Sequence, residues 1–391
     1  MKRILVVQLA RLGDLVQSMP VLAALRARHP QDRIDLLCPA QLRDLAGMIP
    51  GIDRVMGWDG TVWQQWASQA ATGIRRDQLR HIEAELAALC SDSYDRAYVL
   101  NQHPRAILAG ALLAQETVGP LADGPLSERL TPWAAYIREI ATTRKTNHVH
   151  LSDAFCGLCG VVPPGQAAHL QLPATALPAD LERIGQEGTP WIGLIVGAGD
   201  QARQIPAEVW RTWIVQFLNQ ASRGRVVLIG QGAERERARQ IQDALPASLQ
   251  GRVWDVTGRT TVPELAVVLS RCQRVIGSDT GPLHVAAAVG TPVIGWYIAR
   301  ARVHETGPYG PGHIVWQAES PDGGLAVPTT WPIESSLDAL LNRPPAALNG
   351  WSIWMSQADA RGTYYTKAGE AAAPPRAREA IWQELHRAVA A

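Results

Sequence analysis

The chain has 391 residues, of which 47% are hydrophobic and 19% are charged, and its formal net charge is +1. This length is too great for one ordinary hydrophobic core and predicts two domains of roughly 150 to 200 residues each. The near-neutral charge argues against a nucleic-acid partner, which would normally require a basic excess, although a local basic patch facing anionic lipid stays open.

No segment predicts insertion into a membrane. The longest largely apolar stretch without charge, 285–299, is shorter than the roughly 20 residues that span a bilayer, and 290–292 (Gly-Thr-Pro) interrupts it. Residues 1–3 and the apolar run after them resemble the start of a signal peptide, but Arg11 and Asp14 break that run and no convincing cleavage site follows. We therefore expect a cytoplasmic protein.

The five cysteines do not suggest a disulfide framework, because their number is odd and the chain is long. Cys156 and Cys159 form a CxxC pair, but no second pair completes a metal site. We expect both to be ordinary small side chains packed along a helix.

The first part of the chain alternates apolar runs with helical patterns. The expected strands are 4–9, 34–38, 54–58 and 97–100, and the expected helices are 15–28, 61–90 and 104–114. Pro20 must kink or restart the first helix, because proline removes a backbone hydrogen bond. This alternation predicts a doubly wound α/β domain that ends between 151 and 188, where prolines punctuate the chain.

The second part repeats the same rhythm. The expected strands are 191–196, 225–229, 253–256, 274–276 and 292–297, and the expected helices are 209–219, 233–244, 262–270, 282–289 and 377–389. Beyond about Gln317 we expect the alternation to be lost until the last helix. We assign residues 1–170 to a first domain, 171–188 to a linker, 189–320 to a second domain and 321–391 to a C-terminal extension.

The segment 274–297 predicts one strand, helix, strand unit. Pro282 suits the first position of its helix and Gly290 the left-handed residue that ends it. The turn before the helix carries Ser278, Asp279, Thr280 and Gly281. A helix N-terminus beyond the carboxyl end of a parallel strand is a natural seat for a phosphate, and His284 lies just inside it. A plain Rossmann-like turn with a buried histidine is the alternative.

Residues 278–297, SDTGPLHVAAAVGTPVIGWY, closely resemble the signature of glycosyltransferase family 9, the ADP-heptose heptosyltransferases of bacterial lipopolysaccharide assembly. The resemblance extends over residues 1–320 or so. It implies an α/β protein of GT-B fold, with two Rossmann-like doubly wound domains facing a cleft and a C-terminal helix that crosses back. It also implies that Thr280 and Gly281 hold the donor diphosphate, while Asp279 and His284 shape the donor pocket.

Asp14 follows the first expected strand and matches the GD motif of the family, whose aspartate is the proposed catalytic base. The alternative is that Asp14 caps a helix starting at Leu15. Gly13 would let the acceptor or the donor approach the backbone closely. Arg11 is expected to contact anionic groups of the acceptor or a donor phosphate, unless it is a solvated loop residue.

The second domain offers two further donor contacts. Family members usually carry Lys-x-Trp-Pro where this chain has residues 203–206, so Arg203 keeps the positive charge and Ile205 replaces the aromatic residue. Glu234, within GlyGlnGlyAlaGlu, matches the family glutamate near the adenosine ribose. The alternative is that Glu234 is an acidic residue in the first turn of a helix, where a negative charge is favoured.

The acceptor side carries a weaker signal. His103 and Arg105 follow a first-domain strand and could meet an acidic sugar, or belong to a surface loop. No pair of carboxylates is evidently placed for magnesium, so we expect transfer that needs no metal or other cofactor, with a basic side chain and a helix dipole offsetting the charge of the leaving diphosphate.

The resemblance implies an inverting glycosyltransferase that uses ADP-heptose as donor. Its implied acceptor is a glycolipid, a sugar of the lipopolysaccharide inner core, which would bring the enzyme to the cytoplasmic face of the inner membrane as a peripheral protein. Two alternatives stay open. One is a related transferase that acts on a protein or another surface glycan, and the other is a non-catalytic nucleotide-sugar-binding protein.

Overall fold

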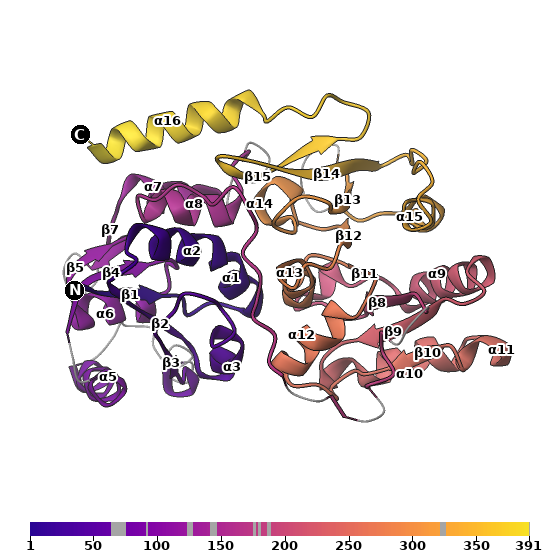
Figure 1. Cartoon of the computed structure of the whole chain (residues 1–391), viewed down its shortest axis with the longest axis horizontal. Coiled ribbons are helices and arrows are strands. Elements are labelled where there is room, and N and C mark those ends of the chain that lie inside the picture. Colours follow the sequence, from indigo (N-terminus) through magenta and orange to yellow (C-terminus); the bar gives the residue numbers. More distant parts are fainter. Residues whose placement is uncertain are drawn as a thin grey trace.

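The computed structural model of the chain describes residues 1–63, 76–90, 93–122, 128–140, 147–174, 177–178, 181–185, 189–320 and 326–390. Two α/β domains lie side by side, and the last helix lies against the first of them (Figure 1). Among the described residues, no helix combines the length and the apolar character that crossing a bilayer requires.

The first domain is built on a five-stranded parallel sheet in the order β3-β2-β1-β4-β5. Its strands are β1 (Arg3–Val7), β2 (Arg33–Pro39), β3 (Arg54–Trp58), β4 (Tyr94–Val99) and β5 (Ala114–Val118), and β6 (Pro120–Ala122) and β7 (Glu128–Leu130) form a separate pair. Its helices are α1 (Leu12–Gln17), α2 (Met19–Arg28), η1 (Ala40–Leu42), α3 (Arg43–Ala46), α5 (Arg76–Leu89), α6 (Pro104–Leu113), α7 (Pro132–Ile140) and α8 (Leu151–Leu158).

The second domain is built on an eight-stranded sheet in the order β10-β9-β8-β11-β12-β13-β14-β15. Its strands are β8 (Trp191–Ile195), β9 (Arg225–Ile229), β10 (Val253–Asp255), β11 (Arg274–Gly277), β12 (Val293–Tyr297), β13 (Ile314–Ala318), β14 (Trp351–Asp359) and β15 (Gly362–Lys367). Its helices are η2 (Gln201–Arg203), α9 (Ala207–Gln220), η3 (Gly232–Glu234), α10 (Arg235–Asp243), α11 (Ala247–Gln250), α12 (Val262–Ser270), α13 (Gly281–Ala288), α14 (Val303–Thr306), α15 (Ile333–Leu340) and α16 (Arg376–Ala390).

The alternation of side chains along the strands sorts them into separate cores. In β1, Leu5 and Val7 join the cluster under α5 and α6, whereas Ile4 and Val6 join the cluster that contains α2 and α8. This second cluster continues without a break into α12 and α13 of the second domain. The apolar core therefore runs through the interface, and the two domains share one packing unit.

The predicted helix between 15 and 28 is broken where its proline required a restart. The chain forms α1, turns at Ser18, and begins α2 with Pro20 in its first turn. The expected helix 61–90 is confirmed over α5, and residues 64–75 of that prediction lie outside the described residues.

The expectation that regular structure stops near Gln317 is wrong. The strand β13 continues the parallel sheet, and β14 and β15 extend it in antiparallel register. The strand β14 pairs with β13, which lies a loop and the helix α15 earlier in the chain, so no local pattern predicts that pairing. The strand β15 pairs with β14 across a tight turn, and our sequence analysis missed this local hairpin. The terminal helix is confirmed as α16, and its Trp382 packs edge-on against Trp133 of α7 with ring centroids 4.8 Å apart. This arrangement is the expected GT-B layout.

The unit 274–297 folds as predicted into β11, α13 and β12. Gly290 follows the helix with φ +83°, in the left-handed region that an L side chain rarely adopts. An added Cβ would meet only the His169 ring at 3.6 Å, which is ordinary contact, so the backbone conformation alone demands glycine.

We predict that Gly290→Ala lowers the free energy of unfolding by about 1 to 2 kcal/mol, the cost of a left-handed alanine. Urea denaturation followed by circular dichroism would measure it. Gly251→Ala is the matched control, because Gly251 also ends a helix but has φ −64° and open space around its missing side chain. The control should be neutral or slightly stabilising, and an equal loss in both variants would contradict the prediction.

Candidate active site between the domains

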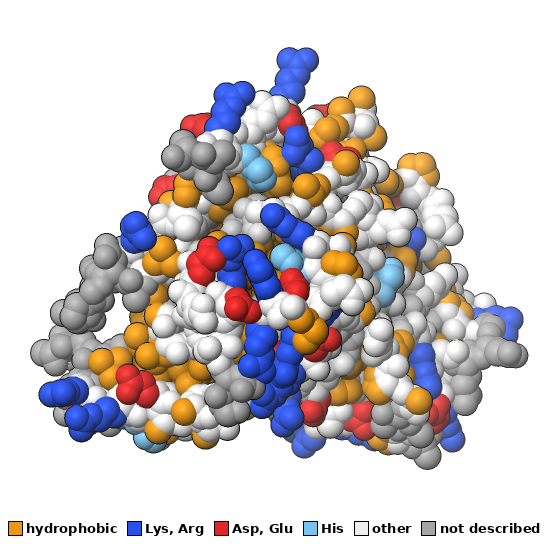
Figure 2. Space-filling view, turned by 60° about the vertical axis from the view of Figure 1, so that its left-hand side comes forward, with side chains coloured by type: hydrophobic (Ala, Val, Ile, Leu, Met, Phe, Trp, Pro, Cys, Tyr) orange, Lys and Arg blue, Asp and Glu red, His pale blue; other side chains and the backbone are white. Residues whose placement is uncertain are grey.

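A cleft of about 580 Å³ lies between the domains, at the carboxyl ends of the parallel strands. Charged and histidine side chains gather near the middle of the molecular face shown in Figure 2. From the first domain the cleft is lined by Arg11, Leu12, Gly13, Asp14, Gln17 and Leu151. From the second domain it is lined chiefly by Gly197, Arg203, Glu234, Asp279, Thr280, Gly281, His284, Arg300, Glu305 and Thr306. Most of the predicted site residues are thus brought to one cavity.

Two glycines let the first turns of α1 and α13 touch across the cleft. A Cβ added to Gly13 would lie 3.1 Å from Cδ2 of His284, and one added to Gly281 would lie 2.8 Å from Cδ2 of Leu12. Both distances are tighter than ordinary contact, so a side chain at either position would press the helices apart. The close neighbour of Gly13 is therefore the second domain itself.

Asp14 is the third residue of α1, and its carboxylate accepts the Arg11 backbone N–H at 3.1 Å. The alternative of a helix cap is thus partly right, but the helix starts at Leu12 and not at Leu15. Burial raises the pKa of Asp14, and the charge of Asp279 adds to this, while the Arg11 hydrogen bond and His284 oppose it. A carboxylate with a raised pKa is a better proton acceptor than an ordinary one.

Asp279 is the centre of a buried polar chain. Its Oδ1 lies 3.3 Å from Nε2 of His284, and its Oδ2 accepts from Nη1 of Arg203 and from Oγ1 of Thr306, each at 3.2 Å. Arg203 Nη1 also donates to the Asp279 carbonyl at 2.6 Å. Burial alone would raise the pKa of Asp279, but its partners His284, Arg203 and Thr306 outweigh it and hold that pKa below its usual value. Asp279 is therefore a fixed anion.

Gln17 extends this chain into the first domain, and our sequence analysis missed it. Its Nε2 lies 3.1 Å from Nε2 of His284, and its side chain is buried. A single ring nitrogen either donates to Asp279 or accepts from an amide N–H. The orientation of the Gln17 amide is thus coupled to the proton on His284. The available signal was a glutamine three residues after Asp14 on the buried side of an apolar helix.

The other two donor-side residues have clear structural surroundings. Glu234 accepts the Gln231 backbone N–H at 2.5 Å, which is the first-turn role expected of an acidic residue, and it also lines the cleft. Ile205 is 2% exposed and packs in the core of the second domain. The departure from the family pattern at this position therefore lies behind the wall of the cleft.

The remaining predicted residues lie away from the cleft lining. His103 caps α6 by accepting the Arg105 backbone N–H at 3.2 Å, and Arg105 is buried with its guanidinium 4.7 Å from the centre of the Trp58 ring. Their contact with an acceptor stays a prediction. All five cysteines are free and buried. Within the described part of the chain, no three His, Cys, Asp or Glu side chains gather in a way that could hold a metal ion.

The chain matches the family model described as glycosyltransferase family 9 (heptosyltransferase) over residues 84–322. It is 24% identical over 317 residues to lipopolysaccharide heptosyltransferase 2 of Escherichia coli (strain K12), covering 75% of this chain and 82% of that protein.

Solved structures share the fold. A glycosyltransferase family 9 protein from Veillonella parvula DSM 2008 aligns with TM-score 0.62 at 20% identity, covering 82% of this chain and 88% of that one. E. coli heptosyltransferase WaaC with ADP aligns with TM-score 0.63 at 18% identity, covering 87% of this chain and 99% of that one.

We predict that Asp14→Asn makes the protein more stable at pH 7. Burial raises the pKa of Asp14 in the folded protein above its ordinary value, so folding favours the protonated acid. That contribution is complete below the unfolded pKa and is lost as the pH rises through the folded pKa. At pH 7 this half-buried carboxyl group therefore lowers the free energy of unfolding, and Asn removes that cost while keeping an oxygen for the Arg11 N–H.

Urea denaturation at pH 7 and near pH 3 tests this, with the gain expected to shrink at the lower pH. Asp200→Asn is the control, because Asp200 is exposed and accepts a backbone N–H from Ala202 in the same manner. The control should gain no stability at pH 7. A loss of stability in Asp14→Asn at pH 7 would contradict the prediction.

Proposed function

Because the chain belongs to glycosyltransferase family 9 and is thus a glycosyltransferase, we propose that it transfers heptose, with inversion, from ADP-heptose to a sugar of the lipopolysaccharide inner core. One observation carries the proposal. A half-buried carboxylate with a raised pKa, Asp14, faces the N-terminus of α13 and its polar chain across a cleft of about 580 Å³. A proton acceptor and a site for a diphosphate are what such a transfer needs.

The donor would bind against the second domain. The N-cap residue Thr280 makes no side-chain cap bond, so the first turn of α13 keeps backbone N–H groups and the positive end of its dipole for an anion. Thr280 and Gly281 would hold the diphosphate. Arg203, whose side chain is 21% exposed, would add positive charge while it holds Asp279. Glu234 would accept hydroxyl groups of the ribose.

The reaction would be a single displacement. Asp14 takes the proton of the acceptor hydroxyl group while the oxygen of that hydroxyl group attacks the anomeric carbon. The bond from the anomeric carbon to the diphosphate oxygen breaks in the same step. ADP leaves toward Arg203, His284 and the N-terminus of α13. The positive charge of Arg203 and the backbone N–H groups of the helix N-terminus stabilise the departing anion. These groups supply that stabilisation without a metal ion, so we propose metal-independent transfer and expect the initial rate to persist in excess EDTA.

The acceptor would bind against the first domain, where Arg11 lines the cleft beside Gly13. The names of similar proteins from Escherichia coli and Salmonella typhimurium, both called lipopolysaccharide heptosyltransferase 2, support a lipopolysaccharide acceptor. His103 and Arg105 remain candidate acceptor contacts only if a conformational change brings the start of α6 to the cleft. We propose a cytoplasmic enzyme that meets its acceptor at the inner membrane.

A second acceptor class, a protein or another surface glycan, stays a candidate because the family match ends at residue 322. Assays of the purified protein with ADP-heptose on lipopolysaccharide core and on protein acceptors separate the two. A non-catalytic binding protein is the third possibility, and the Asp14 variant below tests it.

We predict that Asp14→Asn lowers kcat by about 100-fold or more, the usual effect of removing a general base, with the KM for donor changed little. Measurement of ADP release with lipopolysaccharide core as acceptor would show this. Asp200→Asn, at the rim of the same cleft, should stay near the wild-type rate. Equal rates in Asp14→Asn and the wild type would rule out this residue as the base.

We predict that ADP raises the melting temperature of the protein more than UDP or GDP at equal concentration, because ligand binding to the native state stabilises it by mass action. Arg203→Met should reduce the ADP shift, and Arg203→Lys should retain part of it, because lysine keeps the charge but loses the planar fork. A response to UDP or GDP alone would overturn the ADP-heptose assignment.

A further inference from the structure

Five consecutive residues behind the cleft, 306–310, are each held by a hydrogen bond to a buried or half-buried partner. Tyr297 Oη donates to the Thr306 carbonyl at 2.6 Å, His150 Nε2 to the Gly307 carbonyl at 2.7 Å, Tyr365 Oη to the Pro308 carbonyl at 2.7 Å, Tyr309 Oη to Asp153 Oδ1 at 2.8 Å, and Gly310 N–H to Thr363 Oγ1 at 2.9 Å. These partners come from β12, from the start of α8 in the first domain and from β15.

The His150 contact has a defined proton. Its Nδ1 accepts the Ser152 backbone N–H at 3.1 Å, so the ring hydrogen must be on Nε2, which donates to the Gly307 carbonyl. Burial lowers the pKa of His150 to about 3, which keeps the ring neutral. The first domain therefore grips this segment with a fixed donor.

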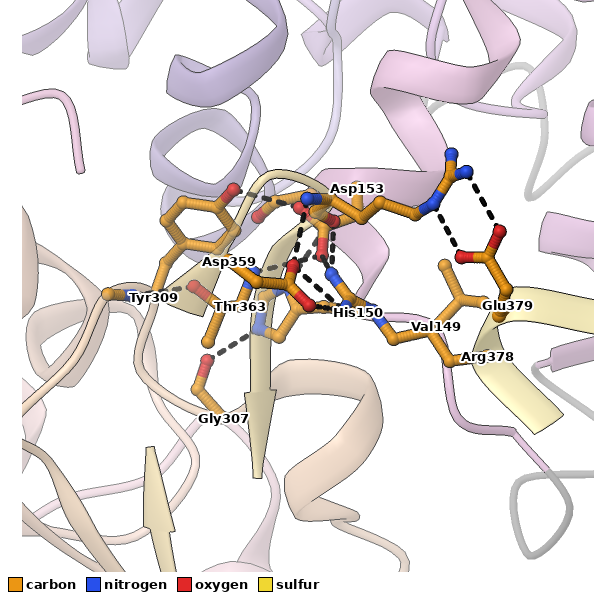
Figure 3. A network of polar contacts seen from close by, with 12 residues as sticks. Val149, His150, Asp153, Gly307, Tyr309, Asp359, Thr363, Arg378 and Glu379 are labelled. Carbon is orange, nitrogen blue, oxygen red and sulfur yellow. Dashed lines mark hydrogen bonds and ion pairs between the residues drawn. The ribbon is translucent and has the colours of Figure 1, made fainter. Parts of the chain in front are cut away.

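Asp153 connects the segment to the last helix (Figure 3). Its Oδ2 accepts the Thr363 backbone N–H at 3.1 Å and lies 3.6 Å from Nη2 of Arg378, which itself pairs with Asp359 at 2.8 Å. Asp153 and Arg378 are 0% and 2% exposed. Gly362 has φ +94°, and a Cβ on it would overlap the Asp153 carboxylate, so the turn between β14 and β15 is shaped around this acid. We refer to Asp153, Tyr309, Thr363 and Arg378 as the brace.

The brace reaches the cleft through Thr306. The Oγ1 of Thr306 donates to Asp279 Oδ2, and both residues line the cleft. Three residues further along the chain, Tyr309 is anchored to Asp153. A shift of segment 306–310 would therefore move one of the hydrogen-bond partners that orient Asp279.

We propose that Asp153, Tyr309 and Arg378 are positioning residues for the transferase site. Arg378 and Thr363 of the C-terminal extension hold Asp153 of the first domain, and Asp153 accepts the Tyr309 hydroxyl. Segment 306–310 is thereby tied to the first domain, and Thr306 and Asp279 are held in place for the donor. The proposal rests on the proposed function, because the ligand that reports on it is ADP.

The test changes one functional group of the brace at a time. Tyr309→Phe deletes the hydroxyl group and keeps the ring, which packs edge-on against His150 at 5.2 Å. Asp153→Asn replaces the acid, whose pKa burial raises to about 8, by a neutral amide that keeps an acceptor oxygen, and Arg378→Lys is the conservative partner. Glu379→Gln is the matched control, since it breaks the neighbouring Arg361 pair, whose side chains are 35% and 46% exposed, and leaves the brace intact.

Calorimetric titration with ADP and donor saturation curves are measured at a temperature where circular dichroism shows each variant folded. For Tyr309→Phe we expect the Kd for ADP and the KM for donor to rise about three- to tenfold, as for coupling through a packed network, with kcat within about twofold of wild type. Arg378→Lys should lie closer to wild type than Asp153→Asn, and the Glu379→Gln control should match wild type.

A purely structural role would lower the melting temperature or the active fraction and leave Kd and KM unchanged, and that result would overturn the proposal. Amide hydrogen exchange of residues 279–284 and 306–310 gives a readout without ligand. Faster exchange in both segments of Tyr309→Phe supports the brace, and unchanged exchange refutes it. Failure of wild-type protein to bind ADP would refute the donor assignment instead, while the exchange result still decides on the brace.

Discussion

The contact between the first turns of α1 and α13 determines the rest of the site. Gly13 and Gly281 have no side chains, so the two helix ends meet at van der Waals distance, and Asp14 comes to lie beside His284 and Asp279. The apolar core that continues from the first domain into the second also holds the two domains together. A site assembled from two domains is usually limited by how well the domains are placed. Here the contact of Gly13 with the His284 side chain, and of Gly281 with the Leu12 side chain, sets that placement.

The same cleft holds two carboxylates with opposite properties. Burial raises the pKa of Asp14, which has one backbone N–H as its hydrogen-bond partner. Asp279 is more deeply buried, yet His284, Arg203 and Thr306 keep its pKa low. Environments that push the pKa values of two acids apart mark a division of roles. Asp14 suits proton transfer, whereas Asp279 suits the orientation of its neighbours.

Local patterns in the sequence predicted much of this structure. Contacts between segments that are distant in the sequence were not predicted. Most parallel strands of the two sheets, the α13 unit with Gly290 and the position of Asp14 at a strand end follow from short-range periodicity and turn chemistry, whereas β5 and β13 were not predicted. The strands β14 and β15 were missed although they form a local hairpin in which Asp359 pairs with Gly362. The pairing of β14 with β13 is longer-range, because α15 separates these two strands in the sequence. Gln17 and Thr306 were missed for a similar reason, since each matters through a residue of another element. Arg105, which looks exposed in the sequence, is buried on Trp58.

The path of the final helix has a consequence for synthesis on the ribosome. Arg378 pairs with Asp153, and Trp382 packs on Trp133, although both partners in the first domain are translated much earlier. Until α16 leaves the exit tunnel, Asp153 lacks its contact with Arg378 and Trp133 lacks its contact with Trp382. A nascent chain can therefore form both sheets in order, but it gains its finished interface only after α16 has been translated.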